Sequence, residues 1–187
     1  MADDKLDLDF SQSFSNEELI IYQNLKKQNT LKTSSVGRLF DAVASLLNIC
    51  HTNTYEGEAA MLLENHVVNY NLKNRKLYCV ISENGLIPTQ ELLRNLIDDL
   101  KNGISKEEII VNFIYTLANL VFQVADSQNI KNIALSGGVF QNTMLVDMLK
   151  NMAKKDYTLF FNCNLSPNDE NISYGQIMHY LHIKIHK

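Results

Sequence analysis

The sequence predicts a mixed α/β domain, and three observations indicate this fold class. Apolar residues recur every three or four positions through most of the chain, which is typical of amphipathic helices. The period changes to short apolar runs at 77–82, 132–136 and 157–162, which we interpret as strands of one sheet. Only 7 glycines and 2 prolines occur in 187 residues, and this weighs against a turn-rich all-β fold.

The first half of the chain is expected to be helical. Residues 1–16 are polar and aperiodic, so we expect a flexible lead-in followed by a single domain over 17–187. A first helix is expected after Ser15, because the carboxylates of Glu17 and Glu18 suit the positive end of a helix dipole. Further helices are expected after Ser35 and over 56–67, where apolar side chains form stripes at helical spacing.

The second half is expected to alternate between helices and strands. A helix over 89–101 is followed by one over 106–128, whose apolar residues lie on nearly every side, so it should be central and buried. The strand 132–136, a Gly137–Gly138 turn, a helix over 141–154 and the strand 157–162 then form a βαβ unit. A helix over 174–183 closes the chain, and ligands of such units bind at the carboxyl ends of the strands.

Composition excludes several classes of function. The chain has 17 basic and 21 acidic residues, a net charge of −4, which weighs against sequence-independent binding of nucleic acid. No apolar run approaches the roughly 20 residues of a membrane span, and the acidic start does not resemble a signal peptide. Three well-separated cysteines without a CxxC pair indicate reduced thiols, so we expect a cytoplasmic protein with no membrane partner.

The segment 132–142, NIALSGGVFQN, is the most informative about chemistry. Glycines between a strand and a helix allow backbone N–H groups to approach an anion, and the helix N-terminus adds partial positive charge. Asn142 would then hydrogen-bond the polar edge of a nucleotide. The pattern is neither a GxGxxG fingerprint nor a P-loop, and an ordinary strand–helix turn explains it equally well.

Two earlier segments carry weaker signals. In SSVGRLFD, residues 34–41, the carboxylate of Asp41 is a candidate acceptor for ribose hydroxyls, although a solvated helix start capped by Ser35 explains the same residues. In YEGE, residues 55–58, Gly57 is unfavourable in a helix and indicates a close approach of backbone, although a plain helix start is the simpler alternative.

Two later groups contain potential metal ligands. Asp169 in SPNDEN, residues 166–171, lies beyond the end of a strand, but a lone loop carboxylate is usually only solvated. His179, His182 and His186 have helical spacing, but no cysteine or carboxylate accompanies them, so we interpret them as surface residues.

Taken in order, these segments resemble a known family. SSVGRLFDAVASLL, YEGEAAMLLE, LSGGVFQNTML and SPNDEN, followed by Gly175–Gln176, are similar to the C-terminal part of hydrogenase maturation carbamoyltransferases, the HypF family. The similarity covers about residues 33–183, and the GRLFDAVA and GGVFQN strings favour this family over the related tRNA threonylcarbamoyl-transfer enzyme. The resemblance implies one lobe of an actin-like, sugar-kinase-like ATPase fold.

The resemblance also implies a reaction and a site. The family uses carbamoyl phosphate and ATP to make carbamoyl-adenylate, then passes the carbamoyl group to the C-terminal cysteine of a hydrogenase maturation protein. The residues matching its nucleotide site are Asp41, Gly57, Gly137, Gly138 and Asn142. Asp169 matches a carboxylate that completes an iron or zinc site.

The departures from the family pattern set a limit. The family's upstream histidine-rich metal motif, first lobe and upstream domains have no counterpart in the sequence, and its NDGG reads NDEN at 168–171. We therefore expect the first lobe and upstream domains to be partners, and expect this chain alone neither to hold a metal nor to transfer carbamoyl groups. A non-catalytic binding or scaffold lobe that keeps the fold is the alternative, and a tRNA-modification relative is less favoured by the motifs.

Overall fold

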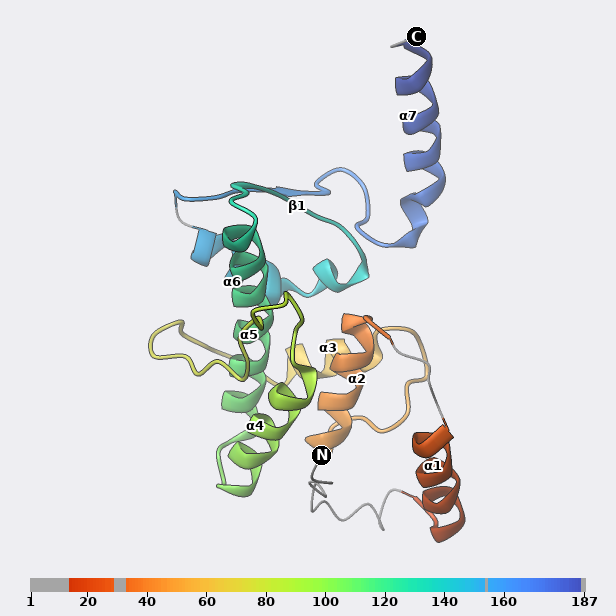
Figure 1. Cartoon of the computed structure of the whole chain (residues 1–187), viewed down its shortest axis with the longest axis vertical. Coiled ribbons are helices and arrows are strands. Elements are labelled where there is room, and N and C mark those ends of the chain that lie inside the picture. Colours follow the sequence, from red (N-terminus) through yellow and green to blue (C-terminus); the bar gives the residue numbers. More distant parts are fainter. Residues whose placement is uncertain (1–13, 29–32, 154, 186–187) are drawn as a thin grey trace.

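The computed structural model describes residues 14–28, 33–153 and 155–185 (Figure 1). Residues 1–13 of the expected lead-in lie outside the described residues, so the division into a lead-in and one domain stays a prediction. The helices are α1 (Asn16–Gln28), α2 (Val36–Leu46), α3 (Glu58–Asn65), α4 (Thr89–Lys101), α5 (Lys106–Ser127), α6 (Thr143–Ala153) and α7 (Ile172–Ile185). The remaining elements are the strands β1 (Asn132–Leu135) and β2 (Thr158–Phe161) and the 3-10 turns η1 (Gly138–Gln141) and η2 (Asp169–Asn171).

The two strands form a parallel sheet, and the expected α/β fold class is confirmed. Asn132 pairs with Thr158 and Leu135 with Phe161, so the strands run side by side over their whole length. η1 and α6 connect them, which is the βαβ unit expected from the sequence. Both carboxyl ends therefore lie at one edge of the sheet, where the segments after β1 and β2 meet.

Helix α5 is the centre of the core, as its all-round apolar pattern predicts. Half of its 22 residues are buried, and its Phe113 ring meets Phe40 of α2 edge to face, with the ring centroids 5.1 Å apart. By length and composition α5 is apolar enough to span a membrane, but 61% of its apolar 18-residue window is buried inside the fold, as is usual for the core helix of a globular domain.

The prediction of a third strand at 77–82 is wrong. This segment is extended but pairs with no strand, because side chains of neighbouring helices take its hydrogen bonds. The N–H group of Tyr78 donates to Thr116 Oγ1 at 3.0 Å, and that of Ile81 donates to Gln123 Oε1 at 2.8 Å. Asn95 Nδ2 of α4 donates to the Tyr78 carbonyl at 2.7 Å.

The spacing of these contacts fits the geometry of the two elements. The backbone N–H group of Lys76 donates to Asn112 Oδ1 at 3.3 Å, so successive contacts run from Lys76 to Ile81 along the segment and from Asn112 to Gln123 along α5. Five steps of extended chain cover about 17 Å. Eleven residues of α-helix also cover about 17 Å. The segment thus lies along α5 in matched register, with three of its N–H groups bonded to side chains of that helix.

Local signals account for the helix boundaries. Ser35 and Ser105 accept hydrogen bonds from the N–H groups of Arg38 and Glu108, and so cap α2 and α5. Helix α3 begins at Glu58, two residues later than expected, because Gly57 before it adopts a left-handed conformation with φ 84°.

The Tyr78–Thr116 bond yields a test of this arrangement. Thr116→Val keeps the shape of the side chain but leaves a buried N–H group without a partner, so we expect a loss of about 1–3 kcal/mol in the free energy of unfolding. Urea denaturation measures it, with the exposed Thr52→Val as the matched control. Equal midpoints for the two variants would show that the bond does not hold the segment.

Candidate functional site

The turn after β1 packs against the loop after β2. The Gly137 N–H group donates to the Pro167 carbonyl at 2.7 Å, and Gln141 Nε2 donates to Ser166 Oγ at 3.5 Å. Gly137 has φ 112°, a conformation that favours glycine, and a Cβ placed on Gly138 would lie 3.9 Å from Asn168 Cβ. The structure therefore joins two of the four motif segments, 132–142 and 166–171, at the carboxyl edge of the sheet.

Asn142 is the most unusual residue of this turn. Its side chain is only 6% exposed, and its Oδ1 accepts a hydrogen bond from the Leu145 N–H group at 2.8 Å, which caps α6. Its Nδ2 is the one buried side-chain nitrogen or oxygen without a hydrogen-bond partner in the described part of the chain. An unpartnered buried donor costs about 1–3 kcal/mol, so the site contains a donor for which a ligand acceptor would be favourable.

Glu64 of α3 caps the N-terminus of α6. Its Oε1 accepts hydrogen bonds from the N–H groups of Thr143 at 2.9 Å and Met144 at 3.3 Å, and also from the Thr143 hydroxyl. Asn142 accepts hydrogen bonds from the next two N–H groups, that of Leu145 through its side chain and that of Val146 through its carbonyl. The first four N–H groups of α6 are thus bonded within the chain in this conformation, and the contribution of this helix end to anion binding stays a prediction.

The donors that remain lie one turn earlier. The first N–H groups of a 3-10 turn have no partner within it, and those of Gly138 and Val139 donate to none of the described residues. Gly137 is engaged with Pro167, so its N–H group is not available to a ligand in this arrangement. Gly138 and Asn142 are therefore the members of the predicted turn that offer free donors.

Asp41 is already bound on both carboxylate oxygens. Its Oδ1 accepts from Asn53 Nδ2 at 2.9 Å, and its Oδ2 lies 3.1 Å from Arg38 Nη1. Asn53 Oδ1 in turn accepts from the Ala59 N–H group at 3.1 Å, so Asp41 ties α2 to the start of α3. A carboxylate oxygen accepts more than one hydrogen bond, and a ribose hydroxyl would share Asp41 with these residues.

Gly57 lies in the same α2–α3 connection. Its left-handed backbone explains the glycine, and a Cβ there would meet no atom within 4 Å. Beside it, Glu58 accepts a hydrogen bond from the Thr54 N–H group at 2.5 Å, which lowers the pKa of the Glu58 carboxyl. Asp41 on α2 thus contacts, through Asn53, the connection that contains Gly57. The hydrogen bonds that Glu64 accepts from Thr143 and Met144 link α3 to α6.

The carboxylate of Asp169 does not belong to a metal site within this chain as described. Asp169 is exposed at the start of η2, where Asn168 Oδ1 accepts the Glu170 N–H group at 3.1 Å. The described residues contain no group of three histidine, cysteine, aspartate or glutamate side chains that could hold a metal. His179 and His182 are exposed on α7, as expected of surface residues, and His186 lies outside the described residues.

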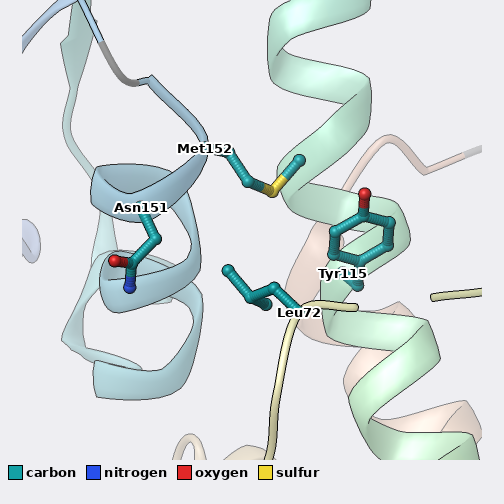
Figure 2. Close-up of a pocket in the computed structure, with 4 residues that line it drawn as sticks. All are labelled: Leu72, Tyr115, Asn151 and Met152. Carbon is teal, nitrogen blue, oxygen red and sulfur yellow. The ribbon is translucent and has the colours of Figure 1, made fainter. Parts of the chain in front are cut away.

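Two cavities of the described structure lie away from these residues. One of about 300 Å³ is lined by Leu72, Tyr115, Asn151 and Met152, and Figure 2 shows the first two and Met152 facing a shared space between α5 and α6. A second, of about 380 Å³, is formed by residues around the 82–85 turn and the end of α5. Neither of these two cavities is lined by a predicted site residue.

Sequence reasoning did not single out Glu64, although it lies in the YEGEAAMLLE motif. The available signal was indirect. Helix α6 has no acidic residue in its first turn, so its N–H groups needed an acceptor from another part of the chain.

Comparison with known proteins gives consistent matches. Residues 2–176 match a family described as carbamoyltransferase, Kae1-like domain, second subdomain. The chain is 33% identical over 175 residues to the probable carbamoyltransferase HypF of Methanocaldococcus jannaschii, and 28% identical over 193 residues to carbamoyltransferase HypF of a Synechocystis species. These matches cover 90% and 91% of this chain but 23% and 24% of the relatives, so it spans about a quarter of their length.

Two solved structures resemble the fold. Full-length HypF in the phosphate- and nucleotide-bound form has a TM-score of 0.72 and 32% identity, covering 90% of this chain and 28% of that one. HypF of T. kodakarensis has a TM-score of 0.70 and 30% identity, covering 86% of this chain and 21% of that one.

The capping role of Glu64 can be tested by two substitutions. Glu64→Ala removes the acceptor of the first N–H groups of α6, and we expect a loss of about 1–2 kcal/mol in the free energy of unfolding. Glu64→Gln keeps an acceptor oxygen and should lose less than half of that amount. Urea denaturation compares both with Glu83→Ala in an exposed turn. A Glu64→Ala variant as stable as this control would contradict the role.

Proposed function

The chain belongs to the HypF carbamoyltransferase family, and from that premise we propose that it supplies the nucleotide-facing lobe of an ATP-dependent enzyme of nickel–iron hydrogenase maturation. In the proposed reaction, hydrolysis of carbamoyl phosphate releases phosphate and leaves carbamate, which attacks the α-phosphorus of ATP and displaces pyrophosphate. The carbamoyl group of the resulting carbamoyl-adenylate then passes to the thiol of the C-terminal cysteine of a maturation protein, with AMP as the leaving group. Because the chain spans about a quarter of its relatives, the reaction is assigned to the lobe together with a first lobe and upstream domains.

The observation that carries this proposal is the unpartnered Nδ2 of Asn142. It lies in the turn that follows β1, at the carboxyl edge of a parallel sheet, where α/β domains bind their ligands. The ring nitrogens of adenine and the oxygens of ribose are acceptors that match such a donor. A related solved structure is described as nucleotide-bound, which agrees with this choice of ligand.

The other residues of the proposed site have complementary roles. The N–H group of Gly138 is assigned to the phosphate of the adenylate, because a glycine lets an anion approach the backbone closely. Asp41 is assigned to a ribose hydroxyl, which it would accept beside its bonds to Asn53 and Arg38. Gly57 leaves open space beside the α2–α3 connection, and Gly137 shapes the turn after β1.

No metal step is assigned to this chain. The described residues do not form an iron or zinc site, so Asp169 is proposed only as one ligand of a site whose other ligands come from the first lobe. The three free cysteines fit a reducing compartment, and we place the enzyme in the cytoplasm.

A scaffold role is the second candidate, and one observation favours it. The loop that reads NDEN instead of NDGG forms the 3-10 turn η2 and leads directly into α7. A loop ordered in this way has lost the glycines that let backbone approach a ligand. In this alternative the lobe keeps its fold and its partners but binds no nucleotide.

Replacing Asn142 separates the two candidates. Asn142→Ser keeps a capping oxygen for α6 and removes the amide donor, so ATP affinity should fall about tenfold or more while stability changes little. Titration of the ¹⁵N-labelled chain with ATP measures this, and the side-chain amide signal of Asn142 should shift in the parent. Asn151→Ser, near the other end of α6, is the control.

The same titration has two contrary outcomes. Signals that shift only away from 136–142 and 34–41 would contradict the assigned site. A chain that is folded but unaffected by ATP up to millimolar concentrations favours the scaffold role.

A further inference from the structure

A serine, a histidine and an asparagine form one hydrogen-bonded cluster where α2 ends. Nδ1 of His51 lies 3.0 Å from Ser45 Oγ, and Nε2 of the same ring lies 2.7 Å from Asn48 Oδ1. Ser45 is in the last turn of α2, and Asn48 and His51 follow in the loop after it. None of the three belongs to the nucleotide site proposed above.

The partners of His51 fix the position of its ring proton. An amide oxygen can only accept a hydrogen bond, so the Nε2 atom that faces Asn48 Oδ1 carries the hydrogen in the neutral ring. Nδ1 then has a free electron pair and accepts a hydrogen bond from the Ser45 hydroxyl. This is the arrangement of a general base beside a nucleophile, with a third group that orients the base.

The backbone of the loop brings the three side chains together. Asn48 has φ 53°, a left-handed conformation that asparagine adopts more readily than most residues with a side chain. The N–H groups of Ile49 and Cys50 both donate to the Ala44 carbonyl, at 2.9 and 3.3 Å, so the chain folds back onto the end of α2. His51 is thereby returned to the helix turn that carries Ser45.

The cluster is accessible to a small molecule. Asn48 and His51 are exposed, and Ser45 is partly buried. The backbone N–H groups of His51 and Thr52 donate to none of the described residues, so donors for a developing oxyanion are free in the same loop. An exposed cluster of this kind selects a substrate by its reactivity rather than by its shape, which favours a small activated ester.

We infer that Ser45 is a base-activated nucleophile that accepts the acyl group of small activated esters. Ser45 Oγ attacks the carbonyl carbon while His51 Nδ1 takes the hydroxyl proton, and the tetrahedral adduct then expels the alcohol, which leaves with that proton. Water, with His51 again as the base, hydrolyses the acyl-serine to the free acid and restores the hydroxyl. This activity is separate from carbamoyl transfer and uses neither ATP nor another lobe.

A fluorophosphonate probe tests the nucleophile on the full chain. Its phosphorus forms a bond with Ser45 Oγ, fluoride leaves, and the hydroxyl proton passes to His51. We expect peptide mass spectrometry to find the label on Ser45, and His51→Ala should slow labelling about 100-fold, because positioned general bases contribute about 10²–10⁴-fold. Ser127→Ala and His66→Ala, each at the end of another helix, are the matched controls and should be labelled as fast as the parent.

Asn48 is a positioning residue in this inference, and two substitutions test that role. Asn48→Gly keeps the left-handed backbone but removes the acceptor of the Nε2 hydrogen, so hydrolysis of 4-nitrophenyl acetate should slow about tenfold. Asn48→Asp keeps an acceptor oxygen and should retain most of the rate. Equal rates for these two variants would show that Asn48 does not orient the ring.

Other results overturn the inference as a whole. Labelling of Ser45 that is unchanged in His51→Ala shows an ordinary hydroxyl. Ester hydrolysis that persists in Ser45→Ala shows that the imidazole of His51 reacts directly. An unlabelled Ser45, together with a His51→Ala chain that unfolds at lower urea concentration, identifies the cluster as a cap of α2 only.

A second measurement applies if His51→Ala does not fold. Ser45→Cys places a thiol beside the same base, and iodoacetamide should alkylate this thiol at least about tenfold faster than the exposed thiol of Cys163. Peptide mass spectrometry separates the two sites. Equal rates at the two thiols would show that His51 does not activate the side chain at position 45.

Discussion

Helix α5 must be buried on nearly every side, and this requirement arranges the rest of the fold. Its apolar residues leave almost no solvated face, so α2, α4, α6 and the extended segment 77–82 all pack around it. The ring pairs Phe40–Phe113 and Phe122–Tyr157 attach the second helix and the end of the βαβ unit to the same core. Helices α3 and α6, which are distant in sequence, thereby come together, and Glu64 of α3 accepts a hydrogen bond at the start of α6.

The elements with local signals were predictable from the sequence. Serine caps, first-turn carboxylates and apolar spacing depend only on neighbouring residues, and they located α1, α2, α4 and α5 closely. The segment 77–82 has the apolar, β-branched character of a strand, but its hydrogen-bond partners are on helices. The relevant signal was non-local, because Asn112, Thr116 and Gln123 interrupt an otherwise apolar helix. Polar side chains in a buried helix need hydrogen-bond partners, and here the partners are backbone N–H groups of the segment.

The candidate site was predictable in part for a similar reason. Parallel strands end at one edge, so the meeting of 132–142 with 166–171 followed from the βαβ pattern alone. The capping of α6 by Glu64 did not follow, because it depends on how α3 and α6 both pack near α5. The free amide of Asn142 and the occupied end of α6 together shift the proposed contacts from the helix to the turn before it.

The bonds from Glu64 to Thr143 also bear on the order of assembly during synthesis. They join residues 79 positions apart, so the carboxylate of Glu64 stays hydrated until most of the chain has left the ribosome. Helices α2 and α3 can form early, but the turn that carries Asn142 reaches its final position only when α6 docks beside them. The candidate site is thus among the last parts of this chain to reach its final arrangement, because it needs both α3 and the later helix α6 in place.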